Sequence, residues 1–162
     1  MVKKIISKDA FINEYKQNAQ DFSRNRFYTF STTFLFICSF LHKRTQTELD
    51  TFFSKLLNTS ESLRQVTSSS FTQVRDKISY KAFQHVFEKI VTHFYQNNFH
   101  KTYLGFRIVA IDGSVFILPR TKEMIAEFGE NVLSNNRKWI KAQISFAVDV
   151  LNNICLDAAI LP

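Results

Sequence analysis

The sequence predicts an α+β protein, with an all-helical domain at residues 1–100 followed by a small sheet at residues 105–162. Before residue 98, apolar residues recur every three or four positions, the period of a helix buried on one face. Beyond Gly105 they form extended runs instead. The 45% share of hydrophobic residues is sufficient for a core. We therefore place a domain boundary between Asn98 and Gly105.

Two helices are predicted before residue 43. Ser7 can cap the first, whose apolar side carries Phe11, Ile12, Tyr15, Ala19 and Phe22. The second lies within the window from Phe27 to Leu41, the most apolar part of the chain. That window is interrupted by Ser and Thr and is shorter than the ~20 residues of a membrane-spanning helix, so no membrane association is predicted.

Three further helices complete the predicted helical domain. Thr45-Gln46-Thr47-Glu48 matches a capping box, and the apolar face that follows predicts a helix to Leu57. After a linker, Ser68 can cap a short helix that buries Phe71, Val74 and Ile78. A longer helix is predicted to begin at Ser79 and to end near Gln96.

The predicted sheet begins with a strand at Arg107–Ile111. Its four consecutive apolar residues are typical of a strand covered on both faces, and Gly113 is expected to let the chain turn after Asp112. A short helix at Thr121–Phe128 is stopped by Gly129. Two more strands, 142–150 and 154–160, are joined across Leu151-Asn152-Asn153.

Asp112 is the candidate catalytic and metal-binding residue. A carboxylate at the end of a rigid central strand suits a hard cation such as Mg²⁺, which phosphoryl-transfer enzymes use to activate the attacking oxygen. The alternative is an Asp that only begins a turn. Asp149 is the competing acid; it alternates with Val148 and Val150, and we favour a structural or substrate-facing role for it over a metal role.

The charge distribution favours a polyanionic partner. The net charge is +7, and residues 1–105 carry all of it, with 15 Lys and Arg against 8 Asp and Glu. The helices at 46–57 and 69–78 could form a loose helix-turn-helix, although the ten-residue connection between them exceeds the usual turn. We expect Gln73 or Arg75 near base edges and phosphate contacts from Lys43, Arg44, Arg64 and Lys77. The alternative is an ordinary solvated helix face.

Cys38 and Cys155 are the only cysteines, and they lie far apart in the sequence. Their spacing indicates neither a disulfide framework nor a zinc site. This usage fits a reducing cytoplasm.

Three segments together resemble a known family. The stretch around Arg75, the Asp112-Gly113-Ser114 segment and the stretch Lys141–Ala158 are similar, in order and spacing, to the front part of bacterial insertion-sequence transposases of the DDE type, the insertion-sequence-four-like group. The resemblance covers roughly residues 45–162. It implies a ribonuclease-H-like sheet, with Asp112 as the first catalytic Asp and a ligand of two Mg²⁺ ions. It also implies that the helical region binds DNA at insertion-sequence ends.

The other two carboxylates of that family, a second Asp on the fourth strand and a Glu on a later helix, have no match in the 162 residues. We therefore expect a truncated, cytoplasmic and nucleoid-associated transposase that is inactive alone, with a homo-oligomer or an intact transposase as partner. The missing fourth strand would leave Ile108–Ile111 as an exposed sheet edge. The alternatives are a non-enzymatic DNA-binding or interaction protein that modulates an intact transposase, and a metabolic α+β domain.

Overall fold

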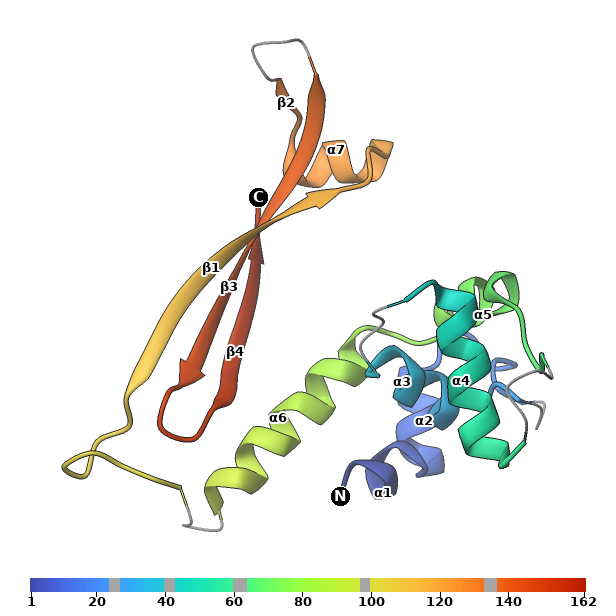
Figure 1. The fold of residues 1–162 in the computed structure, drawn as a ribbon, viewed down its shortest axis with the longest axis horizontal. Coiled ribbons are helices and arrows are strands. Elements are labelled where there is room, and N and C mark those ends of the chain that lie inside the picture. The colour runs from blue at the N-terminus through green and yellow to red at the C-terminus, as the bar shows by residue number, and fades with distance from the viewer. Residues whose placement is uncertain (24–26, 40–42, 60–63, 97–99, 133–136) are drawn as a thin grey trace. The chain divides into compact units, whose positions relative to one another are not determined.

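A computed structural model describes residues 1–23, 27–39, 43–59, 64–96, 100–132 and 137–162. The chain forms two compact units, which we call the helical unit, Met1–Ile90, and the sheet unit, Val91–Pro162 (Figure 1). Helices followed by an antiparallel sheet give the α+β class that the sequence predicts. The units divide within helix α6 (Lys81–Gln96), ahead of the composition change at 98–105, because Tyr95 near the end of that helix bonds to the sheet. Within the described residues, no helix is long and apolar enough to cross a membrane.

The first predicted helix is split in two, α1 (Val2–Ile6) and α2 (Asp9–Tyr15). The prediction that Ser7 caps it is wrong: the Ser7 hydroxyl donates back to the Lys3 carbonyl at 2.7 Å, so it closes α1 instead. Helix α2 ends at Tyr15, before the predicted Ala19 and Phe22. Phe22 has a φ of 60°, which is incompatible with a continued right-handed helix.

Helices α3 (Phe30–Ile37) and α4 (Thr45–Leu57) confirm the next two apolar faces. Thr29 begins α3 through a capping box with Thr32, and the predicted end of that apolar stripe at Leu41 lies outside the described residues. The capping box predicted at Thr45 is not formed. Arg44 is the N-cap of α4, and the Glu48 carboxylate accepts the Lys43 N–H at 2.9 Å, two residues before the Thr45 N–H that the box requires.

The N-cap of helix α5 (Ser68–Arg75) lies one residue before the predicted one. Thr67, not Ser68, is the N-cap, and its capping box with Ser70 satisfies two backbone N–H groups. The helix ends at Arg75, short of the predicted Ile78. From there the chain returns to α2, where the Ser79 N–H donates to the Tyr15 carbonyl at 2.8 Å, before α6 begins.

Two apolar clusters hold the helical unit together, and α3 contributes to both. Phe30 and Phe34 belong to the first, with residues from α1, α2 and α6, whereas Phe36 belongs to the second, with residues from α4 and α5. Ring pairs such as Phe36 and Phe71, whose centroids are 4.8 Å apart edge to face, add aromatic contacts to the burial. The first cluster comprises Ile6, Phe11, Tyr15, Phe30, Phe34, Ile78, Ala82 and Val86. The second comprises Phe36, Leu49, Phe53, Val66, Phe71 and Val74.

The sheet unit is built around one long central strand, β3 (Lys138–Asp149). Strand β1 (Val109–Leu118) pairs antiparallel along one side of it, and β4 (Ile154–Leu161) pairs antiparallel along the other. The hairpin of β3 and β4 confirms the two strands predicted at 142–150 and 154–160. Helix α7 (Lys122–Phe128) confirms the predicted short helix, capped by Thr121 and stopped at Gly129. The two-residue strand β2 (Asn131–Val132), which pairs with the start of β3, was not predicted.

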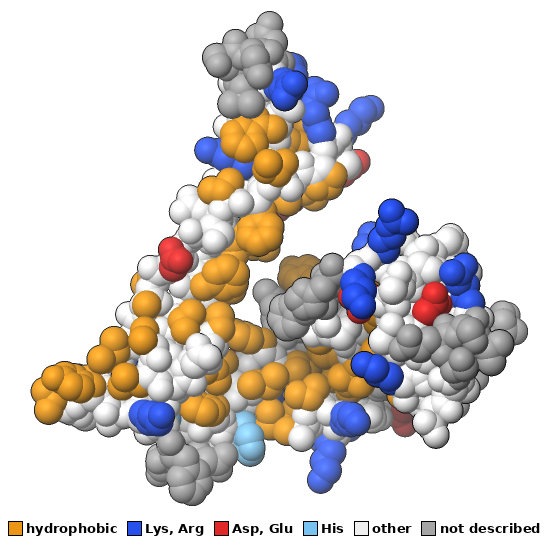
Figure 2. Space-filling view, viewed as in Figure 1, with side chains coloured by type: hydrophobic (Ala, Val, Ile, Leu, Met, Phe, Trp, Pro, Cys, Tyr) orange, Lys and Arg blue, Asp and Glu red, His pale blue; other side chains and the backbone are white. Residues whose placement is uncertain are grey.

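The first strand differs from the prediction in length and in burial. Asp112, Gly113 and Ser114 lie in the middle of β1, opposite Phe146, Ser145 and Ile144 of β3, so the predicted turn at Gly113 is wrong. The predicted burial on both faces is also wrong, since Ile111 is 76% exposed. Figure 2 shows hydrophobic side chains along much of this ribbon. The predicted exposed edge is confirmed, because within the described residues β1 pairs with β3 alone.

Candidate functional site

Asp112 projects from the middle of an exposed strand. Its Oδ1 accepts the N–H of Gly113 at 2.7 Å, a local bond that leaves the carboxylate open to solvent. In the described part of the chain, no three His, Cys, Asp or Glu side chains gather closely enough to hold a metal ion. Mg²⁺ and the two-metal sites of phosphoryl transfer need several oxygen ligands around the ions. The described residues therefore do not fit a Mg²⁺ site, and Asp112 supplies one carboxylate only.

Asp149, the competing acid, is fully buried and fully hydrogen-bonded. Its Oδ2 accepts the Tyr95 hydroxyl at 2.5 Å and the Asn152 side-chain amide at 2.9 Å. Its Oδ1 accepts the backbone N–H groups of Leu151 and Asn152 at 3.1 and 3.2 Å. The Tyr95 bond, followed by the Asn152 and Leu151 bonds, lowers the pKa of Asp149 against the opposing effect of burial. Asp149 thus holds the turn between β3 and β4, a structural role.

The contacts of Asp149 extend to the chain ahead of the sheet. Asn152 accepts the Lys101 N–H at 2.7 Å and donates to the Lys101 carbonyl at 2.9 Å. The Arg107 guanidinium lies 4.4 Å from the centroid of the Tyr95 ring. Burial, and then the hydrogen bond to Asp149, raise the pKa of Tyr95. Sequence reasoning missed Tyr95 and Asn152, because no spacing pattern links residues 95 and 149.

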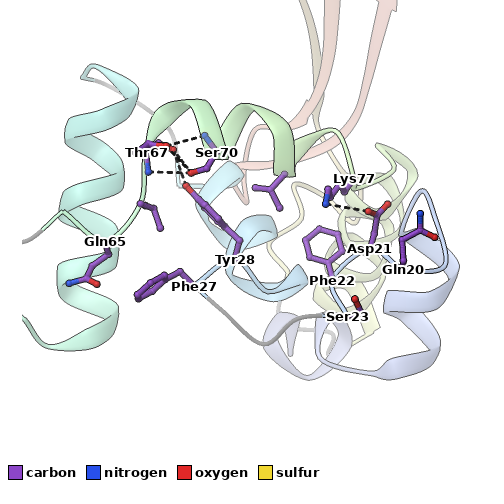
Figure 3. A pocket seen from close by; sticks show the side chains of 12 residues that line it. Gln20, Asp21, Phe22, Ser23, Phe27, Tyr28, Gln65, Thr67, Ser70 and Lys77 are labelled. Atoms are coloured by element: carbon purple, nitrogen blue, oxygen red, sulfur yellow. Dashed lines mark hydrogen bonds and ion pairs between the residues drawn. The ribbon is translucent and has the colours of Figure 1, made fainter.

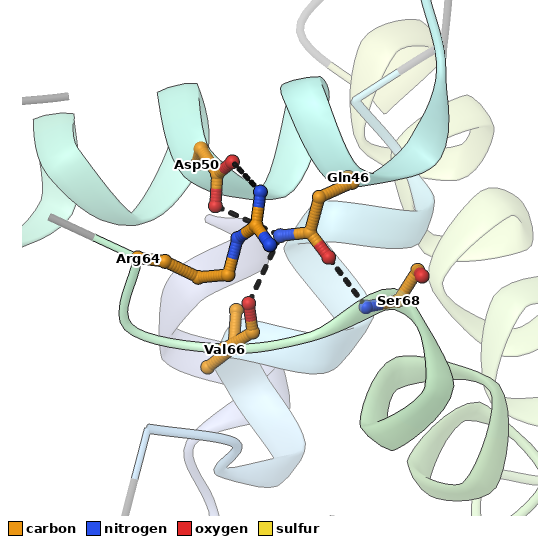
Figure 4. A network of polar contacts seen from close by, with 5 residues as sticks. All are labelled: Gln46, Asp50, Arg64, Val66 and Ser68. Carbon is orange, nitrogen blue, oxygen red and sulfur yellow. Dashed lines mark hydrogen bonds and ion pairs between the residues drawn. The ribbon is translucent and has the colours of Figure 1, made fainter. Parts of the chain in front are cut away.

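The candidate nucleic-acid interface is organised by Gln46, which joins α4 to α5 (Figure 4). The Gln46 amide donates to Asp50 Oδ1 at 2.8 Å and to the Val66 carbonyl at 3.0 Å, and its oxygen accepts the Ser68 N–H at 2.8 Å. Gln46 lies in the first turn of α4, and Ser68 is the first residue of α5. The amino-terminal ends of the two helices therefore meet, and each end carries partial positive charge. We call this meeting point the helix junction.

Three of the six predicted DNA-binding residues lie at or next to the helix junction. Lys43 and Arg44 are exposed and immediately precede α4. Arg64 comes from the linker, with its Nη2 3.6 Å from Asp50 Oδ2 and its side chain 61% exposed. An exposed ion pair of this length is weak and leaves the guanidinium free to exchange partners.

The other three are spread over and beyond α5. Gln73 is exposed in the middle of the helix, and Arg75 at its end lies 3.5 Å from Asp76. Lys77 follows the helix and pairs with the buried carboxylate of Asp21 at 3.4 Å. The amide and backbone N–H of Asn18 also bond to Asp21. Lys77 therefore pairs with a buried acid of its own chain, and its phosphate contact stays a prediction.

A cavity of about 580 Å³ lies beside α5 and was not predicted (Figure 3). The Asp21–Lys77 pair and the capping box of Thr67 and Ser70 both line it. Aromatic side chains of Phe22, Phe27 and Tyr28 line it as well. Burial raises the pKa of Tyr28, whose hydroxyl donates to the Thr67 carbonyl at 3.3 Å. Most of the surface that lines the cavity is apolar, so the cavity by itself indicates no particular ligand.

Comparison with protein-family models, with curated proteins and with solved structures found no match for the chain. The candidate functional features are therefore argued from the residues of this chain alone. They comprise an exposed carboxylate on an edge strand, a buried carboxylate that holds a turn, and a basic helix junction.

Proposed function

We propose that this chain binds DNA through the helix junction, as the DNA-binding and first-strand portion of a DDE-type transposase. The observation that carries the proposal is the Gln46 bridge, which brings two helix amino termini together beside Lys43, Arg44 and Arg64. Helix amino termini and basic side chains are the groups that proteins use to hold phosphates. Residues 1–90 also carry 14 Lys and Arg against 8 Asp and Glu, so the surrounding charge attracts a polyanion.

Helix α5 supplies the second part of a DNA contact. Its inner side is buried through Phe71 and Val74, while Ser69, Thr72 and Gln73 are exposed. A short helix with a small polar outer face can enter the major groove, and Gln can pair with adenine there. The ten residues between α4 and α5 make the connection longer than a standard helix-turn-helix, but Gln46 pins its end to α4.

The sheet supports the transposase part of the proposal. The resemblance leads us to expect Asp112 on a strand that pairs with the next long strand, which then forms a hairpin with a third. The neighbour order β1, β3, β4, with Asp112 on β1, is compatible with that expectation. Strand order and the position of one carboxylate are thus the two observations that support our proposal of a ribonuclease-H-like sheet.

We expect no strand cleavage by this chain on its own. One carboxylate cannot position two Mg²⁺ ions about 4 Å apart, and the described residues offer no further cluster of ligands. Asp112→Asn should therefore leave DNA affinity unchanged or slightly raised. Neither form should cut DNA in Mg²⁺ or Mn²⁺.

The test is the salt dependence of DNA binding, measured by fluorescence anisotropy on a labelled duplex of arbitrary sequence. If Lys43, Arg44 and Arg64 each contact a phosphate, affinity should fall about 40-fold between roughly 50 and 200 mM salt. Lys43→Gln should weaken binding and reduce the logarithmic salt slope by about one. Lys55→Gln is the matched control, since Lys55 is also exposed but lies in the last turn of α4. Equal effects of the two substitutions, or no binding at low salt, would remove the helix junction as the interface.

A non-enzymatic protein that modulates an intact transposase is the second candidate, favoured because no cluster of metal-binding side chains forms around Asp112 in the described residues. It shares the DNA-binding prediction but differs in genetic context. An adjoining reading frame that continues with an Asp and the Tyr-Arg-Glu-Lys pattern supports an interrupted enzyme. A stop followed by unrelated sequence supports the modulator.

A further inference from the structure

The open edge of β1 presents backbone groups in a defined order. The Ile108 carbonyl accepts the Val150 N–H at 3.0 Å, and β1 then follows β3 without a register shift. In an antiparallel ladder, alternate residues bond to the neighbouring strand. The backbone N–H and C=O groups of the even-numbered residues of β1 therefore point to β3. The odd-numbered ones, Val109, Ile111, Gly113, Val115 and Ile117, direct their N–H and C=O groups to the open edge.

Strand β1 has none of the usual features that prevent pairing at such an edge. Its ten residues contain no Lys, Arg or Pro, and Asp112 is its one charged residue. The strand is also long for an edge strand. The Gly113 N–H is satisfied locally by the Asp112 carboxylate, a bond that another acceptor can replace.

The side chains of β1 are symmetric in polarity about Gly113. Asp112 and Ser114 flank the glycine, and three apolar residues follow on each side, Val109-Ala110-Ile111 before and Val115-Phe116-Ile117 after. A second β1 strand running antiparallel about Gly113 would place Asp112 opposite Ser114, Ile111 opposite Val115, Ala110 opposite Phe116 and Val109 opposite Ile117. Every polar side chain would meet a polar one, and every apolar side chain an apolar one.

We propose that the open edge of β1 is a self-association surface, on which a second copy of this chain pairs antiparallel with its two-fold axis at Gly113. Five residue pairs would exchange about ten backbone hydrogen bonds. The pairing is isologous, so each subunit uses the same strand.

Neighbouring registers are worse. Moving the axis to Asp112 places the two carboxylates opposite each other, and like charges directly across strands are destabilising. Moving it to Ser114 places Asp112 opposite Phe116. That register also sets Pro119, which has no N–H, opposite Val109. The Gly113 axis avoids all three conflicts. The self-association proposal depends on the β1 edge and not on DNA binding. The fourth strand of a complete ribonuclease-H-like sheet would compete with a second copy for the same edge.

Opposite charges introduced at Ser114 test the register. Ser114 is exposed, and in the paired dimer it lies opposite Asp112 of the other copy at two symmetric places. Ser114→Asp should raise the dimer dissociation constant about tenfold, and Ser114→Lys should lower it, because one repels and the other attracts Asp112. Sedimentation equilibrium of the full chain over a concentration series measures both. In an Asp112→Asn background the difference between the two substitutions should largely disappear.

A cysteine at the axis tests the geometry directly. In a hydrogen-bonded antiparallel pair the two Cα atoms lie about 5.5 Å apart, within the range of a disulfide. A side chain at Gly113 would contact no atom closer than Gln143 Nε2 at 3.4 Å. With Cys38→Ser and Cys155→Ser as background, Gly113→Cys should give a disulfide-linked dimer on mild oxidation. Val115→Cys should not, because its two copies would lie about 13 Å apart along the strands.

The proposal fails if the chain sediments as a monomer at every concentration up to its solubility limit. It also fails if Ser114→Asp and Ser114→Lys change self-association in the same direction, or if Val115→Cys crosslinks as readily as Gly113→Cys. Circular dichroism of each variant, matched to the parent chain, shows that the sheet is retained. DNA binding measured on the same variants should be unchanged at concentrations below dimerisation, so this proposal and the DNA-binding proposal can fail independently.

Discussion

The two units of this protein treat their apolar residues in opposite ways. In the helical unit, aromatic and aliphatic side chains form two buried clusters that share α3. In the sheet unit, the buried side chains within the described residues are Ile140, Ala142 and Asp149, and Ile117 is 71% exposed. Helices that pack on one another bury an apolar side on each, whereas a single sheet layer leaves both faces open. An apolar stretch of sequence therefore does not show whether its side chains will be buried by other segments of the same chain.

The charge differs between the units as well. Residues 91–162 carry 7 Lys and Arg against 6 Asp and Glu, a net charge of +1, whereas residues 1–90 carry +6. The helical unit is thus the one for which we propose DNA binding, and the sheet unit, with few buried side chains, is the one for which we propose self-association. This is why DNA binding and self-association are assigned to different surfaces.

The largest expected effect is the difference in unfolding free energy between truncating a buried apolar residue of the helical unit and truncating an exposed one of the sheet unit. Phe36 is fully buried among Phe52 and Phe71, so Phe36→Ala should lower the free energy of unfolding by about 3–5 kcal/mol. The matched truncation in the sheet unit, Ile160→Ala, removes a side chain that is 63% exposed and should change it by no more than about 0.5 kcal/mol. Urea unfolding followed by circular dichroism measures both, with the helical signal read for Phe36→Ala and the sheet signal for Ile160→Ala. Comparable losses would break the comparison between the units.

A smaller effect is expected from the buried acid of the sheet unit. Because the folded-state pKa of Asp149 is lowered, its carboxylate stabilises the fold above its unfolded pKa of about 3.9, and this contribution is lost as the pH falls through the folded-state value. Acid should therefore release the β3–β4 turn. Asp149→Asn should weaken the unit near neutral pH and make it less sensitive to acid.

Amide hydrogen exchange at Leu151 and Asn152 measures this release, because both N–H groups donate to Asp149. Tyr95→Phe is the graded control, since it removes the 2.5 Å bond that contributes most to the shift. An acid response that is identical in all three proteins would show that Asp149 does not hold the turn.

The smallest effect concerns the start of α5. Thr67→Ala removes the side-chain acceptor of the Ser70 N–H and should destabilise the helical unit by about 1 kcal/mol. Ser69→Ala is the neighbouring control, because Ser69 is exposed and takes no part in the cap. Thermal unfolding distinguishes them, and an equal change in the two variants would contradict the assignment of Thr67 as the cap.

The helices were the most predictable part of the fold. Apolar spacing located the faces of α3, α4, α5 and α6, because a helix repeats its contacts at fixed intervals along the sequence. The helix starts were less predictable. Helix α5 is capped by Thr67 rather than by the neighbouring Ser68, and α4 begins after Arg44, whose side chain makes no cap bond, rather than at a box formed by Thr45. The hairpin of β3 and β4 was predicted because its strands and turn are contiguous.

For the candidate site, the sequence supplied the residues but not their surroundings. It identified Asp112, and it identified Lys43, Arg44 and Arg64 as basic residues. The helix junction depends on Gln46, whose contacts reach 20 and 22 residues along the chain to Val66 and Ser68. The resemblance to DDE transposases remains a prediction.

The sequence by itself determined the α+β order, the basic front part and the polarity symmetry of β1 about Gly113, since each of these is a local pattern. Tertiary structure alone decided that Asp112 lies in the middle of β1 and that Asp149 is buried against Tyr95. It also decided that α4 and α5 meet at their amino ends. The physical reason is that burial and pairing are set by which distant segments supply the other half of each contact, and a local pattern does not contain that information.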